Sequence, residues 1–117
     1  MRIVVTGGRD FQNRECVYRV LDHLVLNYGL KRVAQGGAAG ADQLTREWCR
    51  YRDIECVEYK ADWMVHGKKA GPLRNMRMLE TERPDLVVSF PGSRGTIGCT
   101  GYAQRLGLPV HRVTETE

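Results

Sequence analysis

Residues 86–96 read LVVSFPGSRGT, an apolar run that leads into a turn containing Gly92 and Gly95. The apolar run predicts a strand buried in a sheet, and Thr96 opens the pattern of a helix. In such a turn, the backbone N–H groups and the N-terminus of the helix can face an anion. The stretch therefore predicts a phosphate-binding unit of strand, turn and helix. The alternative is an ordinary turn, because short glycine motifs also occur without any ligand.

The same unit occurs twice earlier in the chain. Residues 2–6 (RIVVT) lead into the turn TGGRD, and residues 31–35 (KRVAQ) lead into GGAAGAD. Apolar residues at helical spacing follow each turn, and they are Val17, Val20, Leu21, Leu24, Val25 and Tyr28 in the first unit and Ala41, Leu44, Trp48 and Tyr51 in the second. We expect these residues to form the buried faces of two helices.

The rest of the chain continues the alternation of strand and helix. Residues 54–59 and 110–113 read as strands, residues 61–71 as a long polar loop, and Pro72 suits the first turn of a helix that carries Leu73, Met76 and Leu79. Strands that alternate with helices form a parallel sheet covered on both faces, because each crossover is right-handed. The sequence predicts one α/β domain over residues 1–117, a Rossmann-like three-layer fold with a five-stranded parallel sheet of order 3-2-1-4-5.

The glycine turns and several basic residues should meet at one edge of this sheet. All three turns follow the carboxyl ends of strands, where open α/β sheets bind their ligands. Arg9 and Arg94 lie inside turns, and Lys68, Lys69 and Arg74 follow the third strand. The net charge of +4 also favours anionic partners. The sequence therefore predicts an anion site at this edge.

Several familiar functions lack their motifs. No G-x-G-x-x-G follows the first strand, Gln35 stands where a dinucleotide-binding strand would end in an acidic residue, and no G-x-x-x-x-G-K-[ST] loop occurs. The four cysteines form no C-x-x-C pair, so we expect reduced, mostly buried thiols and no metal site. No apolar run is long enough for a signal peptide or a membrane span, so we expect a cytoplasmic protein without a membrane partner.

The whole chain resembles the YspA-like branch of the SLOG superfamily, a Rossmann-like group that also contains the LOG phosphoribohydrolases and the DNA-processing protein DprA. The resemblance rests on four stretches in order, which are TGGRDF at 6–11, QGGAAGAD at 35–42, ADWMVHGKKAGPLRN at 61–75 and FPGSRGT at 90–96. It implies a pocket for a nucleotide or a nucleotide-derived ligand that resembles ADP-ribose. It also implies a homodimer formed through helices beside the pocket.

The resemblance to the LOG enzymes suggests catalytic candidates. Those enzymes cleave the N-glycosidic bond of nucleoside monophosphates with an arginine and the glutamate of a P-G-G-x-G-T-x-x-E motif. Arg74 resembles that arginine, whereas Cys99 stands at the position of the glutamate and Ser93 at that of the second glycine. Glycosidic cleavage needs a carboxylate, so Asp10 or Asp42 would have to supply it. Asp42 alternatively stabilises the first turn of its helix, and Asp10 pairs with Arg9 or caps the first helix.

Two residues of the long polar loop are further candidates. Trp63 either stacks on a base or closes the core beneath the loop, and we favour the second interpretation. His66 could contact phosphate or transfer a proton. The full set of predicted ligand-binding residues is Thr6, Gly7, Gly8, Arg9, Gly36, Gly37, Gly40, Trp63, His66, Lys68, Asn75, Gly92, Ser93, Arg94, Gly95 and Thr96.

Three functions follow from these candidates. The leading hypothesis is a sensor or processing domain that binds a phosphorylated nucleotide derivative. The second is a nucleotide hydrolase of the phosphoribohydrolase type, with Arg74 orienting the phosphate. The third is binding of single-stranded nucleic acid, which ranks last because the chain lacks a dense basic stripe with interleaved aromatic residues. The sequence identifies no cofactor.

Overall fold

The fold alternates strands and helices along the whole chain. The computed structural model describes residues 1–92 and 94–117. Its elements are β1 (Arg2–Thr6), α1 (Arg14–Tyr28), β2 (Arg32–Gln35), α2 (Ala41–Arg52), β3 (Glu55–Glu58), α3 (Trp63–His66), the 3₁₀ helix η1 (Gly67–Lys69), α4 (Ala70–Glu82), β4 (Leu86–Ser89), α5 (Arg94–Arg105) and β5 (Val110–Arg112). The strands form one parallel sheet of order β3-β2-β1-β4-β5, which confirms the predicted topology.

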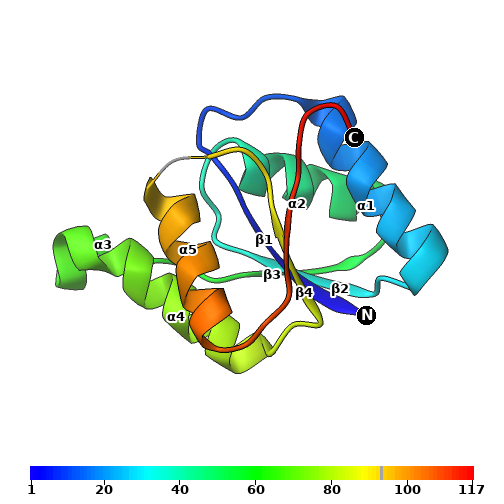
Figure 1. The fold of residues 1–117 in the computed structure, drawn as a ribbon. Helices are drawn as coiled ribbons and strands as arrows, with labels where there is room; N and C mark the ends of the chain where they lie inside the picture. Colours follow the sequence, from blue (N-terminus) through cyan, green and yellow to red (C-terminus); the bar gives the residue numbers. More distant parts are fainter. Residues whose placement is uncertain (93) are drawn as a thin grey trace.

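Helices cover both faces of the sheet (Figure 1). One buried cluster joins α1 and α2 to the sheet, and it includes Leu21, Val33 and Trp48. A second cluster joins α4 and α5 to the opposite face through Val4, Met78, Leu79, Cys99 and Ala103. The fold is therefore the three-layer Rossmann-like sandwich that the sequence predicts.

Four side chains on the predicted helix faces lie outside the core. Val25, Tyr28, Tyr51 and Leu73 are exposed, although each continues the helical spacing of buried residues. Tyr28 and Tyr51 lie at the last turns of α1 and α2, where the helices extend past the sheet. Helical spacing thus predicts the direction of these side chains but not the extent of the sheet beneath them.

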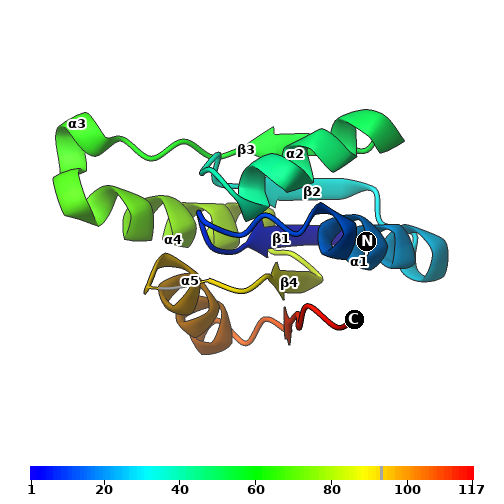
Figure 2. The same cartoon turned by 90° about the horizontal axis from the view of Figure 1, so that it is seen from above.

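The predicted loop after β3 is partly helical. It contains α3 and η1 and leads directly into α4, which begins at Ala70 rather than at Pro72. Asp62 caps α3 by accepting a hydrogen bond from the Val65 amide at 3.1 Å. The segment extends past the carboxyl edge of the sheet (Figure 2), and Trp63 is half exposed, so its assignment to the core is wrong.

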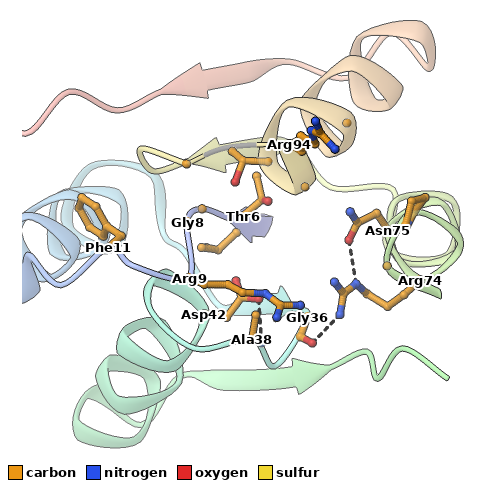
Figure 3. A pocket seen from close by; sticks show the side chains of 18 of the residues that line it. Thr6, Gly8, Arg9, Phe11, Gly36, Ala38, Asp42, Arg74, Asn75 and Arg94 are labelled. Carbon is orange, nitrogen blue, oxygen red and sulfur yellow. Dashed lines mark hydrogen bonds between the residues drawn. The ribbon is translucent and has the colours of Figure 1, made fainter. Parts of the chain in front are cut away.

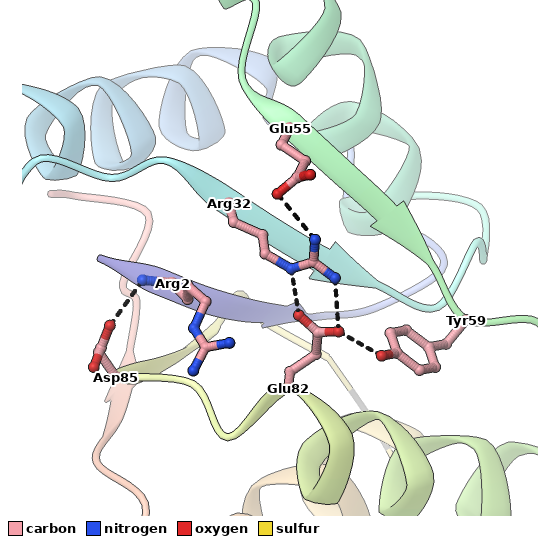
Figure 4. Close-up of polar contacts among 6 residues, drawn as sticks. All are labelled: Arg2, Arg32, Glu55, Tyr59, Glu82 and Asp85. Carbon is pink, nitrogen blue, oxygen red and sulfur yellow. Dashed lines mark hydrogen bonds and ion pairs between the residues drawn. The ribbon is translucent and has the colours of Figure 1, made fainter.

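A polar network joins the start of β2 to the end of α4 (Figure 4). Arg32 Nε and Nη2 donate to the two oxygens of Glu82 at 2.8 and 3.0 Å, and its Nη1 donates to Glu55 at 2.9 Å. The Tyr59 hydroxyl also donates to Glu82. Glu82 is only 4% exposed, and Arg32 holds its pKa below the usual value. The network therefore fixes α4 against the sheet.

No helix in the described ranges has both the length and the apolar character that crossing a bilayer requires.

Candidate functional site

The glycine turns after β1, β2 and β4 meet at the carboxyl edge of the sheet, where they border a pocket of about 980 Å³ (Figure 3). Most of the candidate residues line this pocket, and they are Thr6, Gly7, Gly8, Arg9, Asp10, Gly36, Asp42, Trp63, Lys68, Arg74, Asn75, Gly92, Arg94, Gly95 and Thr96. Gly37 lines an adjoining hollow of about 430 Å³, whereas Gly40 and His66 line neither. The Ser93 candidate lies outside the described residues.

Some of the glycines hold the turns together. A Cβ on Gly40 would lie 2.2 Å from the Gly8 carbonyl oxygen, and one on Gly92 would lie 2.7 Å from the Gly8 nitrogen. The Gly8 N–H donates to the Pro91 carbonyl at 2.8 Å, so this amide is engaged within the fold. Gly8, Gly40 and Gly92 are therefore needed for close contact between turns, apart from any role in ligand binding.

Arg74 reaches the pocket from α4 (Figure 3). Its Nη1 donates to the Gly36 carbonyl at 2.6 Å, and its Nε donates to Asn75 Oδ1 at 2.8 Å. Burial lowers the pKa of the guanidinium, although the group stays charged. Of the ion pairs in the described part of the chain, none includes Arg74. The side chain is thus a fixed cation held by uncharged acceptors.

Asp42 lies in the first turn of α2, as the sequence predicts, and is 6% exposed. Its Oδ2 accepts a hydrogen bond from the Ala38 amide at 3.2 Å. Burial raises the pKa of this carboxyl to about 6, against the lowering influence of the Ala38 amide and Arg74. A buried carboxyl that titrates near neutral pH can exchange a proton with a ligand.

Asp10 neither caps α1 nor forms an ion pair with Arg9. The side chain that caps α1 is Asn13, which accepts a hydrogen bond from the Cys16 amide at 3.1 Å. Among the described residues, no ion pair joins Asp10 to Arg9. Asp10 is exposed at the pocket rim.

Cys99 is fully buried beneath the pocket, on the inner side of α5. Burial raises the pKa of its thiol to about 11, so the group is protonated at neutral pH. A buried neutral thiol cannot take over the role of a catalytic glutamate.

Arg9 and Trp63 border both the pocket and the adjoining hollow. The Arg9 guanidinium lies 5.8 Å from the centre of the Trp63 ring, within the range of a cation–π contact. Because Trp63 is half exposed, part of its ring is available for stacking with a ligand.

The sequence analysis missed several lining residues. Phe11 packs beside Phe90 with ring centres 5.6 Å apart, and Tyr102, Arg105 and Glu115 also line the pocket. Arg105 follows Arg94 by eleven positions, about three helical turns, so the spacing places both arginines on one face of α5. Glu115 follows the last strand and has no comparable signal in the sequence.

Within residues 1–92 and 94–117, no three His, Cys, Asp or Glu side chains form a group that could hold a metal ion.

Three comparisons place the chain among known proteins. The chain is 39% identical to the Gene 61 protein of Mycobacterium phage D29, with 93% of each sequence covered. The X-ray structure of TM1055 superposes with a TM-score of 0.75 and 22% identity over 93% of this chain and 71% of that one. The UDP-GlcNAc 2-epimerase of Neisseria meningitidis, crystallised with UDP-GlcNAc, gives a TM-score of 0.64 and 16% identity over 97% of this chain and 32% of the epimerase.

The two structural similarities show the fold. The family follows from the sequence, because residues 1–66 match the model of the YspA, cpYpsA-related SLOG family, and they include the turns TGGRD and GGAAGAD. The chain belongs to the YspA, cpYpsA-related SLOG family.

Proposed function

We propose that the chain binds a phosphorylated, nucleotide-derived ligand in the pocket at the carboxyl edge of the sheet. The observation that carries this proposal is Arg74, a partly buried cation held by the Gly36 carbonyl and Asn75 and included in none of the ion pairs among the described residues. Arg9, Lys68 and Arg94 line the same pocket. An anionic group would neutralise this concentration of positive charge.

The N-terminal turn of α5 supports the proposal. Gly95 and Thr96 line the pocket in the first turn of this helix, where backbone amides lack partners within the helix. These amides can donate to phosphate oxygens, and Arg94 can add a charged donor.

The size of the pocket and Trp63 suit a ligand larger than phosphate. A volume of about 980 Å³ falls within the usual range of small-molecule sites. The half-exposed Trp63 ring offers a stacking surface for a base. The epimerase crystallised with UDP-GlcNAc shows that a related fold can carry a nucleotide sugar. We therefore favour a ligand of the ADP-ribose type.

Asp42 favours a second candidate function, hydrolysis of the ligand's glycosidic bond. It is a buried carboxyl with a raised pKa of about 6, and it lies in the same pocket as Arg74. The buried Cys99 at the position of the LOG glutamate argues against the LOG mechanism itself. Binding without cleavage is therefore the first candidate. Chromatography after long incubation of AMP with the protein decides between the two, because hydrolysis releases free adenine.

Calorimetry with inorganic phosphate, ribose 5-phosphate, AMP and ADP-ribose tests the proposal. We expect at least one of these compounds to bind, and we expect Arg94→Ala to weaken binding by roughly 1–3 kcal/mol, the range of a charge-assisted hydrogen bond. Arg50→Ala is the matched control, because Arg50 is exposed on α2 and does not line the pocket. Absence of binding by all four compounds at millimolar concentration would reject the proposal.

We also expect the chain to form a homodimer through helices beside the pocket. Met64 on α3 and Ile97 on α5 are apolar, and their side chains are 97% and 68% exposed. A second copy could cover them. Light scattering at tens of micromolar should give twice the mass of one chain, and the mass of a single chain would contradict this expectation.

A further inference from the structure

One oxygen of the Asp42 carboxyl has no hydrogen-bond donor among the residues that the structure describes. Oδ2 accepts from the Ala38 amide at 3.2 Å, whereas Oδ1 is buried and unpartnered. Asp42 as a whole is only 6% exposed, and it contributes to the wall of the pocket. Buried polar atoms in folded proteins are nearly always paired, so an unpaired carboxylate oxygen at a pocket wall calls for an explanation.

The neighbouring cation does not supply that donor. Arg74 directs Nη1 to the Gly36 carbonyl and Nε to Asn75, as Figure 3 shows. The Gly36 amide also lies near Asp42 and favours its charged form, but it makes no hydrogen bond with Oδ1. Glu58 and the Cys99 thiol are the other neighbours, and neither provides a positive charge. Asp42 therefore keeps a strong acceptor beside the space that a ligand would fill.

Phosphate is the wrong partner for this acceptor. A phosphate dianion has no proton to donate, and a carboxylate repels it. The phosphate of the proposed ligand would instead lie toward the arginines and the first turn of α5. The group that reaches Asp42 must be a neutral or positive hydrogen-bond donor on the same ligand.

We propose that Asp42 accepts a hydrogen bond from a sugar hydroxyl of the ligand, so that the pocket selects ribose-bearing phosphates over their deoxy analogues. The inference rests on the proposed function, because it requires that a phosphorylated ligand bind in this pocket. A donor on the base, such as an exocyclic amino group, is the competing source, and it would make the deoxy analogues bind as well as the ribose form.

The experiment compares AMP, 2′-deoxy-AMP and 3′-deoxy-AMP by calorimetry. For the wild-type chain, we expect removal of one of the hydroxyls to weaken binding about 10- to 100-fold, the range of one hydrogen bond to a charged group. In Asp42→Asn, the amide oxygen can still accept from Ala38, which leaves the NH₂ group facing the ligand. The NH₂ group can only donate to the hydroxyl in a bond between neutral groups, so this variant should lose most of the preference for AMP over the affected deoxy analogue.

Asp53→Asn is the matched control, because it removes the same charge from an exposed position at the end of the same helix and outside the pocket. It should keep the preference for AMP. Equal binding of all three nucleotides by the wild-type chain overturns the hydroxyl assignment. An unchanged preference for AMP in Asp42→Asn also overturns it. Both results leave the proposed function intact. Failure of AMP and ADP-ribose to bind at all overturns the proposed function itself. The comparison of nucleotides with the wild-type chain tests the hydroxyl preference even if Asp42→Asn does not fold. Asp42→Ala then tests whether Asp42 is the source of that preference, which should be lost in this variant.

Discussion

The buried carboxyl of Asp42 destabilises the ligand-free folded chain when it is charged. Burial raises its pKa from 3.8 to about 6, although the Ala38 amide and Arg74 favour the charged form. The folded chain therefore binds a proton more tightly than the unfolded chain between these pH values. The contribution of Asp42 to the free energy of unfolding is therefore most favourable below pH 4 and decreases as the pH rises from about 4 to about 6. Such a cost is typical of residues retained for function.

Replacement of this carboxyl should therefore stabilise the ligand-free protein. We expect Asp42→Asn to raise the free energy of unfolding by roughly 2–3 kcal/mol at pH 8, the equivalent of a shift of about two pKa units. At pH 4 the gain should almost vanish, because the folded wild-type carboxyl is then protonated. Urea denaturation at the two pH values measures the difference. A variant less stable than the wild-type chain at pH 8 would show that Asp42 serves the fold.

At the scale of the element, the first turn of α5 is the part of the pocket that a single side chain can block. A Cβ on Gly95 meets no atom within 4 Å, so the fold has room for a larger residue there. Gly95 nevertheless lines the pocket, where added carbon atoms would occupy the space of the anion. A larger residue at position 95 should thus block ligand binding without preventing the domain from folding.

We expect Gly95→Val to abolish ligand binding while the domain stays folded. Gly101→Val is the matched control, because Gly101 lies on the same helix, has equally open space around its Cβ and does not line the pocket. Circular dichroism melts and calorimetry on both variants make the comparison. Normal binding by Gly95→Val would mean that α5 does not hold the phosphate.

The ion pair between Glu82 on α4 and Arg32 on β2 allows a prediction about the fold away from the pocket. The Arg32 guanidinium lowers the pKa of this nearly buried carboxyl, so the ion pair stabilises the fold above pH 4.5 and loses its effect as the pH falls further. We expect Glu82→Ala to cost roughly 3 kcal/mol at pH 7 and clearly less at pH 3. Denaturant unfolding at both values measures this, with exposed Glu80→Ala as the control. An equal loss at both pH values would contradict the electrostatic account.

For the molecule as a whole, the sequence predicts the topology and the edge that holds the pocket. Apolar runs such as Leu86–Ser89 mark the strands, and the handedness of parallel crossovers restricts their order. Because parallel strands end at one edge, the glycine turns had to meet there. Buried Trp48 also follows from its helical spacing, since α2 packs against the sheet along most of its length.

Other features depend on contacts between distant segments. The close approach of Gly8 to Gly40 and Gly92 joins three separate turns, and no local pattern reveals it. The half exposure of Trp63 follows from its position on α3, which extends past the sheet (Figure 2). The unpaired Oδ1 of Asp42 likewise depends on how Arg74 is oriented from α4. These properties require the folded structure.

We expect the carboxyl edge of the sheet to bind the phosphate of a nucleotide-derived ligand. A crystal structure of the chain grown with ADP-ribose is the most direct test of this binding mode. We predict that a phosphate lies within hydrogen-bonding distance of the Gly95 and Thr96 amides, with at least one of Arg74 and Arg94 donating to its oxygens. A ligand bound on another surface, with the pocket closed by its own side chains, would contradict this expectation and leave the glycines as turn residues alone.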